Sequence, residues 1–324
     1  MDDLSKRQRR LRDEQKIQNY RALSSKVLEN KVNRLYNDFV FKQTTALLAE
    51  NPEFYTIWNY RRDIITNHYV PSLPQKELIS LFEEELKFIM FKLKDYPKVY
   101  WIWNHRRWTL ENHPVANWEF ELKIVSKLLS QDSRNYHGWH YRRSIIKEIE
   151  KSIGKSLALQ EFHYTTEMIN SNFSNFSAWH NRSKLIPVLL KSKPTTEFDD
   201  VLSFLKKELY LLKNAIYTDP EDQSAWIYLR WLLTDDIFVT SISKGDYIEI
   251  LSEERANIKE LNELEKDDNN GLDNNWCLKT LVTIENLLIR FDDKNYQEDV
   301  INSLKKLIEA DPLRKNMYID RLEL

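Results

Sequence analysis

Apolar residues recur at helical spacing along most of this chain. After Glu121, for example, they follow on one helical face at Leu122, Val125, Leu128 and Leu129. Other segments carry an aromatic residue, a tryptophan three positions later and an aliphatic residue seven positions after that. These triplets are Tyr55, Trp58 and Ile65; Tyr100, Trp103 and Leu110; Tyr136, Trp139 and Ile146; and Phe176, Trp179 and Ile186. Such a stripe is typical of the buried seam between packed helices. No segment shows convincing strand periodicity, so we expect an all-α protein.

The tryptophan segments are repeats of one motif. A Trp, a polar residue, any residue and two arginines recur at Trp58–Arg62, Trp103–Arg107 and Trp139–Arg143, and weaker copies follow at Trp179–Ser183 and Trp226–Arg230. The tryptophans lie 45, 36, 40 and 47 residues apart, a spacing typical of stacked helical hairpins. A Glu followed by an apolar residue stands eighteen residues before four of these tryptophans, at Glu85, Glu121, Glu161 and Glu208. We expect these glutamates to pair with recurrent arginines such as Arg142 between hairpins, and to be structural.

The repeats predict the organisation of the whole chain. We expect residues 1–324 to form a single all-α repeat domain, an α-α superhelix or solenoid of tetratricopeptide-like hairpins. The hairpins are expected at about 38–69, 77–113, 118–150, 156–191 and 199–240, with a degenerate hairpin at about 246–291 and C-terminal helices at 293–324.

Smaller features predict where helices begin and end. We expect a basic, frayed start over residues 1–13, an amphipathic helix over 14–37, and loops at 191–200 and 265–275. Second helices are expected to start at Asn51-Pro52, Asp132-Ser133 and Asp219-Pro220, because Asn or Asp caps a helix and Pro is accepted at its first position.

Composition removes several classes of function. A net charge of −2 argues against a general binder of nucleic acids or membrane surfaces, and four scattered glycines argue against a phosphate-cradling loop. The single cysteine, Cys277, excludes an internal disulfide and a Cys-rich zinc site, and is expected to be a buried, inert thiol. The chain shows no signal peptide and no apolar run that would span a bilayer, so we expect a cytoplasmic protein.

The positions where the repeats differ from one another are the candidates for function. Five residues before each tryptophan stand Glu53, Lys98, Arg134, Ser174 and Glu221, and two residues before it stand Thr56, Trp101, His137, Ser177 and Ser224. The fold therefore requires neither Lys98 nor His137. Both lie near the start of second helices, where free N–H groups favour anions. With Arg134, and with Tyr100 and Tyr136 as hydroxyl donors, they predict a phosphate or diphosphate site.

Two other interpretations stay open at these positions. The same residues are also compatible with a solvated surface beside core tyrosines. His137 and His140 are three residues apart and could begin a metal site, but no third or fourth ligand is evident, so we assign no metal site to this chain.

The motifs as a whole resemble a known family. The Trp-Asn/His-x-Arg-Arg repeat with its upstream Glu-Leu is similar to the α subunits of the protein prenyltransferases, from about residue 38 to 240. Within that family the chain looks most like the Rab geranylgeranyltransferase (type II) α subunits of yeasts. The segments that carry this likeness are Arg12–Ile17, Trp58–Ile65 and Asp311–Asn316.

The resemblance implies a fold, a partner and an activity. It implies a crescent of hairpins wrapped around a β subunit, which holds the catalytic zinc and most of the lipid pocket, while this chain binds no cofactor. The heterodimer would transfer geranylgeranyl from geranylgeranyl diphosphate to C-terminal cysteines of Rab GTPases presented by an escort protein. Some Rab-type α subunits carry a His after the initiator Met that reaches the zinc. Asp2 stands there in this chain, so the sequence leaves open whether the N-terminus is self-inhibitory.

The resemblance also assigns roles to residues. The family's diphosphate lysine matches Lys98, with Tyr100 beside it, and its Asn-Tyr-His motif matches Asn135, Tyr136 and His137. We therefore expect Lys98, Tyr100, Tyr136 and His137 to be catalytic, and Lys98, Arg134, Asn135 and His137 to bind the diphosphate.

Two alternatives remain. One is the α subunit of a farnesyl or type-I geranylgeranyl transferase, and the other, from a different class, is a non-catalytic helical-repeat scaffold. The persistent Arg-Arg pair and the exceptional Lys98 favour the enzyme subunit. The sequence leaves open the lipid length, the docking surface of the escort protein, and whether Tyr100 and Tyr136 face the core or a ligand.

Overall fold

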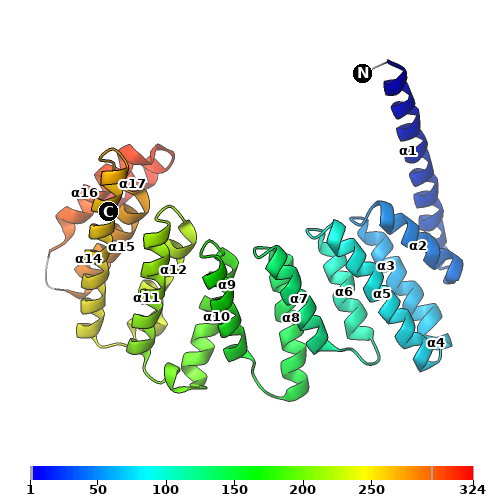
Figure 1. The fold of residues 1–324 in the computed structure, drawn as a ribbon, viewed down its shortest axis with the longest axis horizontal. Helices are drawn as coiled ribbons and strands as arrows, with labels where there is room; N and C mark the ends of the chain where they lie inside the picture. Colours follow the sequence, from blue (N-terminus) through cyan, green and yellow to red (C-terminus); the bar gives the residue numbers. More distant parts are fainter. Residues whose placement is uncertain (1–2, 293–294, 324) are drawn as a thin grey trace. The chain divides into compact units, whose positions relative to one another are not determined.

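A computed structural model describes residues 3–292 and 295–323, and in these two ranges the regular structure is entirely helical (Figure 1). The predicted all-α class is therefore confirmed. Asp2, on which the question of self-inhibition depends, lies outside the described residues.

The chain forms two compact units, of which the first extends to Gly154 and the second begins at Lys155. The first unit contains α1 (Asp3–Val32), α2 (Asp38–Glu50), α3 (Tyr55–Ile64), a π-helical turn (Ile65–Tyr69), α4 (Val70–Ser72), α5 (Gln75–Asp95), α6 (Tyr100–Asn112), α7 (Trp118–Gln131) and α8 (Tyr136–Ile153).

The second unit continues with α9 (Ala158–Ser171), α10 (Phe176–Ser192), a 3₁₀ turn (Thr196–Phe198), α11 (Val201–Thr218), α12 (Gln223–Thr234), α13 (Asp236–Val239), α14 (Lys244–Asp268), α15 (Asn275–Phe291), α16 (Gln297–Ala310), a second 3₁₀ turn (Pro312–Arg314) and α17 (Lys315–Leu322). That residues 1–324 fold as a single domain stays a prediction.

Consecutive helices pack as hairpins within each unit (Figure 1). The pairs are α2 with α3, α5 with α6 and α7 with α8 in the first unit, and α9 with α10, α11 with α12 and α14 with α15 in the second. The chain is thus built from helical hairpin repeats, as the tryptophan spacing predicts.

The recurrent tryptophan holds the turn inside each hairpin. All five indole rings are buried, and each Nε1–H donates a hydrogen bond to the carbonyl oxygen six residues earlier. The five bonds run from Trp58 to Pro52 (2.8 Å), Trp103 to Pro97 (2.9 Å), Trp139 to Ser133 (2.9 Å), Trp179 to Phe173 (2.8 Å) and Trp226 to Pro220 (2.9 Å). The tryptophan recurs because one side chain fills the core and also satisfies a turn carbonyl.

The recurrent glutamate joins successive hairpins. In the first unit Glu85 accepts two hydrogen bonds from Arg61, at 2.6 Å each, and Glu121 accepts two from Arg106, at 2.6 and 2.7 Å. In the second unit Glu208 is bound in the same way by Arg182. Each arginine comes from the hairpin before that of its glutamate, and all six side chains are buried. The expected pairing between hairpins therefore occurs.

The predicted apolar stripe is wrong at its first position. The tryptophans and aliphatic residues are buried, but Tyr55, Tyr100, Tyr136 and Phe176 are exposed. Each of these four is the first residue of its helix. A helical side chain covers the turn that precedes it, and a first residue has no such turn to pack on.

The predicted starts of the second helices are also wrong, by three residues or more. Asn51, Asp132 and Asp219 cap the C-terminal ends of α2, α7 and α11, and their N–H groups donate to carbonyls four residues back. The second helices start only after the turn, because the indole bond holds the turn residues in a non-helical conformation.

The N-terminal helix differs from the prediction at both ends. α1 begins at Asp3 and not near residue 14, and it ends at Val32 (Figure 1). Of its apolar residues Val27 is buried, whereas Ile17 and Val32 are exposed. Only part of this helix therefore packs on the hairpins.

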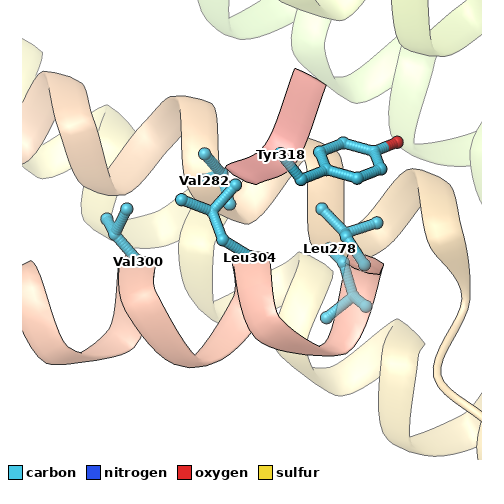
Figure 2. Close-up of a cluster of buried hydrophobic side chains, with 6 residues drawn as sticks. Leu278, Val282, Val300, Leu304 and Tyr318 are labelled. Carbon is cyan, nitrogen blue, oxygen red and sulfur yellow. The ribbon is translucent and has the colours of Figure 1, made fainter. Parts of the chain in front are cut away.

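A separate core closes the C-terminal end of the second unit. Figure 2 shows buried side chains from α15, α16 and α17 in contact. They are Leu278, Val282, Val300, Leu304, Leu307 and Tyr318. The Tyr318 hydroxyl donates to Asp311 at 2.8 Å, and Asp311 also pairs with Lys279 at 2.9 Å. The degenerate hairpin and the last helices are thus one packed cluster.

Candidate functional site

The residues that sequence analysis selects come from two neighbouring turns of the first unit. Lys98 lies in the turn between α5 and α6, and Arg134 lies in the turn between α7 and α8. Asn135 connects the two turns, because its Nδ2 donates to the carbonyl of Pro97 at 3.0 Å. The structure therefore places the residues from repeats two and three next to each other.

Local sequence explains why the second turn is held so firmly. Asn135 is the N-cap of α8, and its Oδ1 accepts the N–H groups of His137 at 3.1 Å and Gly138 at 3.3 Å. A Cβ at Gly138 would lie 2.9 Å from Leu129 Cδ2, so glycine allows α8 to approach α7. Since both amide atoms of buried Asn135 are used within the chain, its side chain positions the turn.

Five aromatic side chains, which we call the aromatic row, cross the three turns of the first unit. The distances between ring centroids are 5.1 Å from Tyr55 to Trp101, 5.1 Å from Trp101 to Tyr100, 5.8 Å from Tyr100 to His137 and 3.9 Å from His137 to Tyr136. Tyr55, Tyr100 and Tyr136 are 52, 46 and 67% exposed. The interpretation of Tyr100 and Tyr136 as core residues is therefore wrong, and both can meet a ligand or a partner.

His137 is buried and lies between the rings of Tyr100 and Tyr136. Burial lowers the pKa of its imidazole, and the positive charges of Lys98 and His140 lower it further, whereas a hydrogen bond with the Lys98 main chain and the charge of Glu53 oppose the shift. The ring is therefore neutral near pH 7. It acts as a hydrogen-bonding group, not as a fixed cation.

Four charged side chains, Glu53, Lys98, Asp132 and Arg134, come from the same three hairpin turns and form what we call the charge cluster. The Lys98 Nζ makes an ion pair with Asp132, and both side chains reach solvent. Arg134 is exposed, and it makes no ion pair with any residue that the structure describes. The cluster thus presents one guanidinium and one partnered ammonium on an exposed face.

Sequence reasoning missed Asp132 and Trp101 as parts of this site. Asp132 was assigned only a capping role, and Trp101 was named only as a repeat position. A signal existed for Asp132, because it stands two residues before Arg134, which the repeat register already placed beside Lys98. The contact of Trp101 with Tyr55 forms only through the packing of two hairpins, so the sequence alone does not reveal it.

The described residues offer neither a cluster of metal ligands nor a reactive thiol. Over residues 3–292 and 295–323, no three His, Cys, Asp or Glu side chains gather in a way that would hold a metal ion. Burial raises the pKa of the Cys277 thiol to about 12, so this residue of the second unit stays protonated. None of the helices in the described ranges is both long and apolar enough to cross a membrane.

The chain matches the family model described as the protein prenyltransferase alpha subunit repeat. The match covers residues 39–68, 82–113, 118–149, 158–188 and 205–235. Each of these segments holds one of the five tryptophan motifs.

Three yeast proteins that share one name are similar to this chain over nearly its whole length. The geranylgeranyl transferase type-2 subunit alpha of Saccharomyces cerevisiae is 43% identical over 322 residues, which cover 98% of this chain and 95% of that protein. The proteins of the same name from Candida albicans and Schizosaccharomyces pombe are 42% and 41% identical, over 98% and 97% of this chain and 94% of each relative.

One solved structure has a similar fold. It is the Candida albicans protein geranylgeranyltransferase-I complexed with GGPP, in which one chain matches with a TM-score of 0.67 and 21% identity, over 94% of this chain and 90% of that one. At this identity the likeness concerns the fold alone.

Proposed function

Because the chain belongs to the family of geranylgeranyl transferase type-2 α subunits, and is thus a component of a protein prenyltransferase, we propose that it works as a heterodimer with a β subunit. The heterodimer transfers geranylgeranyl from geranylgeranyl diphosphate to C-terminal cysteines of Rab GTPases, which an escort protein presents in the cytoplasm. Identities of 41–43% to type-2 relatives, against 21% to the type-I structure, support this over a type-I enzyme.

In this proposal the chemistry is divided between the two subunits. A zinc ion held by the β subunit supplies a thiolate nucleophile from the Rab cysteine. This chain receives the diphosphate, which gains negative charge as the bond between carbon and oxygen breaks. Groups that stabilise this charge more in the transition state than in the ground state accelerate the transfer.

Each residue of the candidate site has a role that its surroundings suit. Lys98 offers an ammonium and Arg134 a guanidinium, while the exposed phenols of Tyr100 and Tyr136 offer O–H donors. Neutral His137 supplies a hydrogen bond and supports the Tyr100 ring, 5.8 Å away. Asn135 holds the two turns together through Pro97. Together these groups form a set of donors suited to diphosphate.

The observation that carries the proposal is that Lys98 and His137, from two different repeats, are brought close together. Lys98 and His137 are the residues that the repeat does not require, and the hydrogen bond of 3.0 Å from Asn135 Nδ2 to the carbonyl of Pro97 joins the segments from which they come. A scaffold that only stacks hairpins gives no reason for these two exceptions to lie in adjoining segments.

The test is the rate of single-turnover transfer by the heterodimer carrying Lys98→Ala. We expect the rate to fall by about 10²–10³-fold, as is typical when one preorganised charge-stabilising group is lost, while folding and β-subunit association are kept. Lys98→Arg should recover part of the rate, because the charge returns with a different geometry.

Lys87 offers a matched control. Its side chain is 64% exposed and pairs with Glu84, whereas the Lys98 side chain is 63% exposed and pairs with Asp132. Lys87→Ala should transfer at the wild-type rate. Near-normal transfer by Lys98→Ala would remove this chain from the chemistry and leave it as a scaffold for the β subunit.

A further inference from the structure

Lys98 is not a free cation in this structure. Its Nζ contacts the Oδ2 of Asp132, the residue that caps the C-terminal end of α7. The two side chains come from successive turns, 34 residues apart in sequence. Because they are 63% and 38% exposed, the contact can open into solvent without disturbing the core.

The Asp132 side chain is used differently from its counterparts in the other repeats. Asp132 stands seven residues before its tryptophan, where other repeats carry Asn51, Asn172 and Asp219. Each of those three accepts the main-chain N–H two residues later, at 3.1, 3.0 and 3.2 Å. Within the described ranges the Asp132 carboxylate makes no such bond, and its Oδ2 is directed to Lys98 instead.

The pair changes the charge that an anion meets. The charge cluster holds two cations, Lys98 and Arg134, and two anions, Glu53 and Asp132. Its formal charge is therefore zero while Asp132 is ionised. A phosphate oxygen and the Asp132 carboxylate are both acceptors for the same ammonium, so a diphosphate that binds Lys98 competes with Asp132.

We propose that Asp132 is a competing counter-ion for Lys98, which occupies the ammonium in the free enzyme and is displaced by the diphosphate. The proposal rests on the function proposed above, because it takes Lys98 as a diphosphate-binding residue. Its consequence is selective: a diphosphate carries enough charge to displace the carboxylate, whereas a singly charged phosphate ester does not. The same competition weakens the hold on the pyrophosphate product and favours its release.

The experiment measures the binding of inorganic pyrophosphate to the chain purified together with its β subunit, by calorimetry. Asp132→Asn removes the charge, and Asn51 and Asn172 show that the fold accepts Asn at this position. We expect pyrophosphate to bind about fivefold more tightly, the size expected when an exposed ion pair no longer competes.

Glu53→Gln is the matched control. It removes one negative charge from the same cluster, but the structure shows no bond between Glu53 and Lys98 in the part of the chain that it describes. We expect less than about a twofold change. If Glu53→Gln tightened binding as much as Asp132→Asn, the effect would be one of net charge, and the competition would be disproved.

A double variant shows whether Asp132 acts through Lys98. In the Lys98→Ala background Asp132→Asn should no longer tighten pyrophosphate binding, since no ammonium is left to release. Weaker binding by the single Asp132→Asn variant would mean that Asp132 positions Lys98 and does not compete for it, which overturns the inference. If Lys98→Ala itself left both pyrophosphate binding and transfer unchanged, the proposed function of Lys98 would be wrong. This outcome differs from those that disprove only the competition by Asp132.

Discussion

At the scale of single residues, His105 shows how one repeat departs from the others inside the core. The residue two positions after the tryptophan is Tyr141 in the third hairpin and Tyr228 in the fifth, and each of these tyrosines donates to the glutamate of its own hairpin at 2.7 Å. His105 takes this place in the second hairpin, with its Nε2 2.7 Å from Glu85. Its Nδ1 lies 3.1 Å from the Nε of Arg62, which can only donate. These two contacts fix a neutral ring with its proton on Nε2.

This arrangement predicts a loss of stability in mild acid. Burial lowers the pKa of His105 to about 4, although Glu85 opposes the shift, whereas an unfolded histidine titrates near 6.5. Between these values the unfolded chain binds a proton that the folded chain does not, so stability falls as the pH falls through this window. The full shift corresponds to about 3 kcal/mol. His105→Tyr should remove most of this fall, as measured by urea unfolding of the heterodimer at pH 7, 6 and 5.

His105 and its neighbour Glu85 lose their contributions to stability in different pH ranges. Burial raises the pKa of Glu85, but the charge of Arg61 and the hydrogen bonds from His105 and Arg61 outweigh it and lower the pKa to about 2. Its contribution is therefore lost only below about pH 4.5. His163 is exposed, and His163→Asn should keep the wild-type pH dependence. An unchanged acid response in His105→Tyr would show that His105 is not its source.

At the scale of elements, the recurrent glutamates connect successive hairpins. Glu121 on α7 is bound by Arg106 of α6 from the hairpin before, and by Tyr141 of α8 from its own hairpin. One carboxylate thus ties three helices together. The same connections hold Glu85 in the first unit and Glu208 in the second. This explains why Glu and Arg recur at constant distances from the tryptophans.

Removing one of these glutamates should lower the free energy of unfolding. Glu121→Ala leaves buried Arg106 without its carboxylate, and breaking a buried pair in this way costs about 3–5 kcal/mol. Glu111→Ala removes an exposed partner of Arg107, a contact of 2.7 Å within one helix, and should cost less than about 0.5 kcal/mol. Chemical unfolding of the heterodimer measures both. If Glu121→Ala unfolded like the wild type while transfer fell, Glu121 would be a functional residue.

At the scale of the whole molecule, the exposed aromatic row is the feature that points to a partner. Tyr55, Tyr100 and Tyr136 lie in contact through Trp101 and His137 and reach solvent from three successive hairpins. An exposed apolar surface of this kind is typical of an interaction site, and it favours aggregation when left uncovered. The proposed β subunit is the partner that we expect to cover it.

We therefore predict that co-expression with a β subunit raises the soluble yield of this chain. The comparison is the soluble fraction of the same chain expressed alone and together with its partner, under equal conditions. The chain that is purified alone should also catalyse no transfer. Equal yields with and without the β subunit would argue against an obligate heterodimer.

The sequence by itself determined the repeat class and the residues that the repeat does not require. The tryptophan spacing, the glutamate register and the exceptions at Lys98 and His137 are visible along the chain, because each follows from local periodicity. A helix start such as Asp132-Ser133 was misplaced for the same reason. Capping preferences are local, whereas the indole bond from Trp139 to Ser133 is made only after the hairpin closes.

Only the tertiary structure decided which side chains face solvent and which charges meet. Tyr100 and Tyr136 lie on an apolar stripe at helical spacing, which predicts burial, yet both are exposed. Each is the first residue of its helix and has no preceding turn to cover. The pairing of Lys98 with Asp132 depends on two turns 34 residues apart in the chain. It forms because Asn135 binds the carbonyl of Pro97 and holds these turns together, and no pattern within one repeat encodes a contact between two.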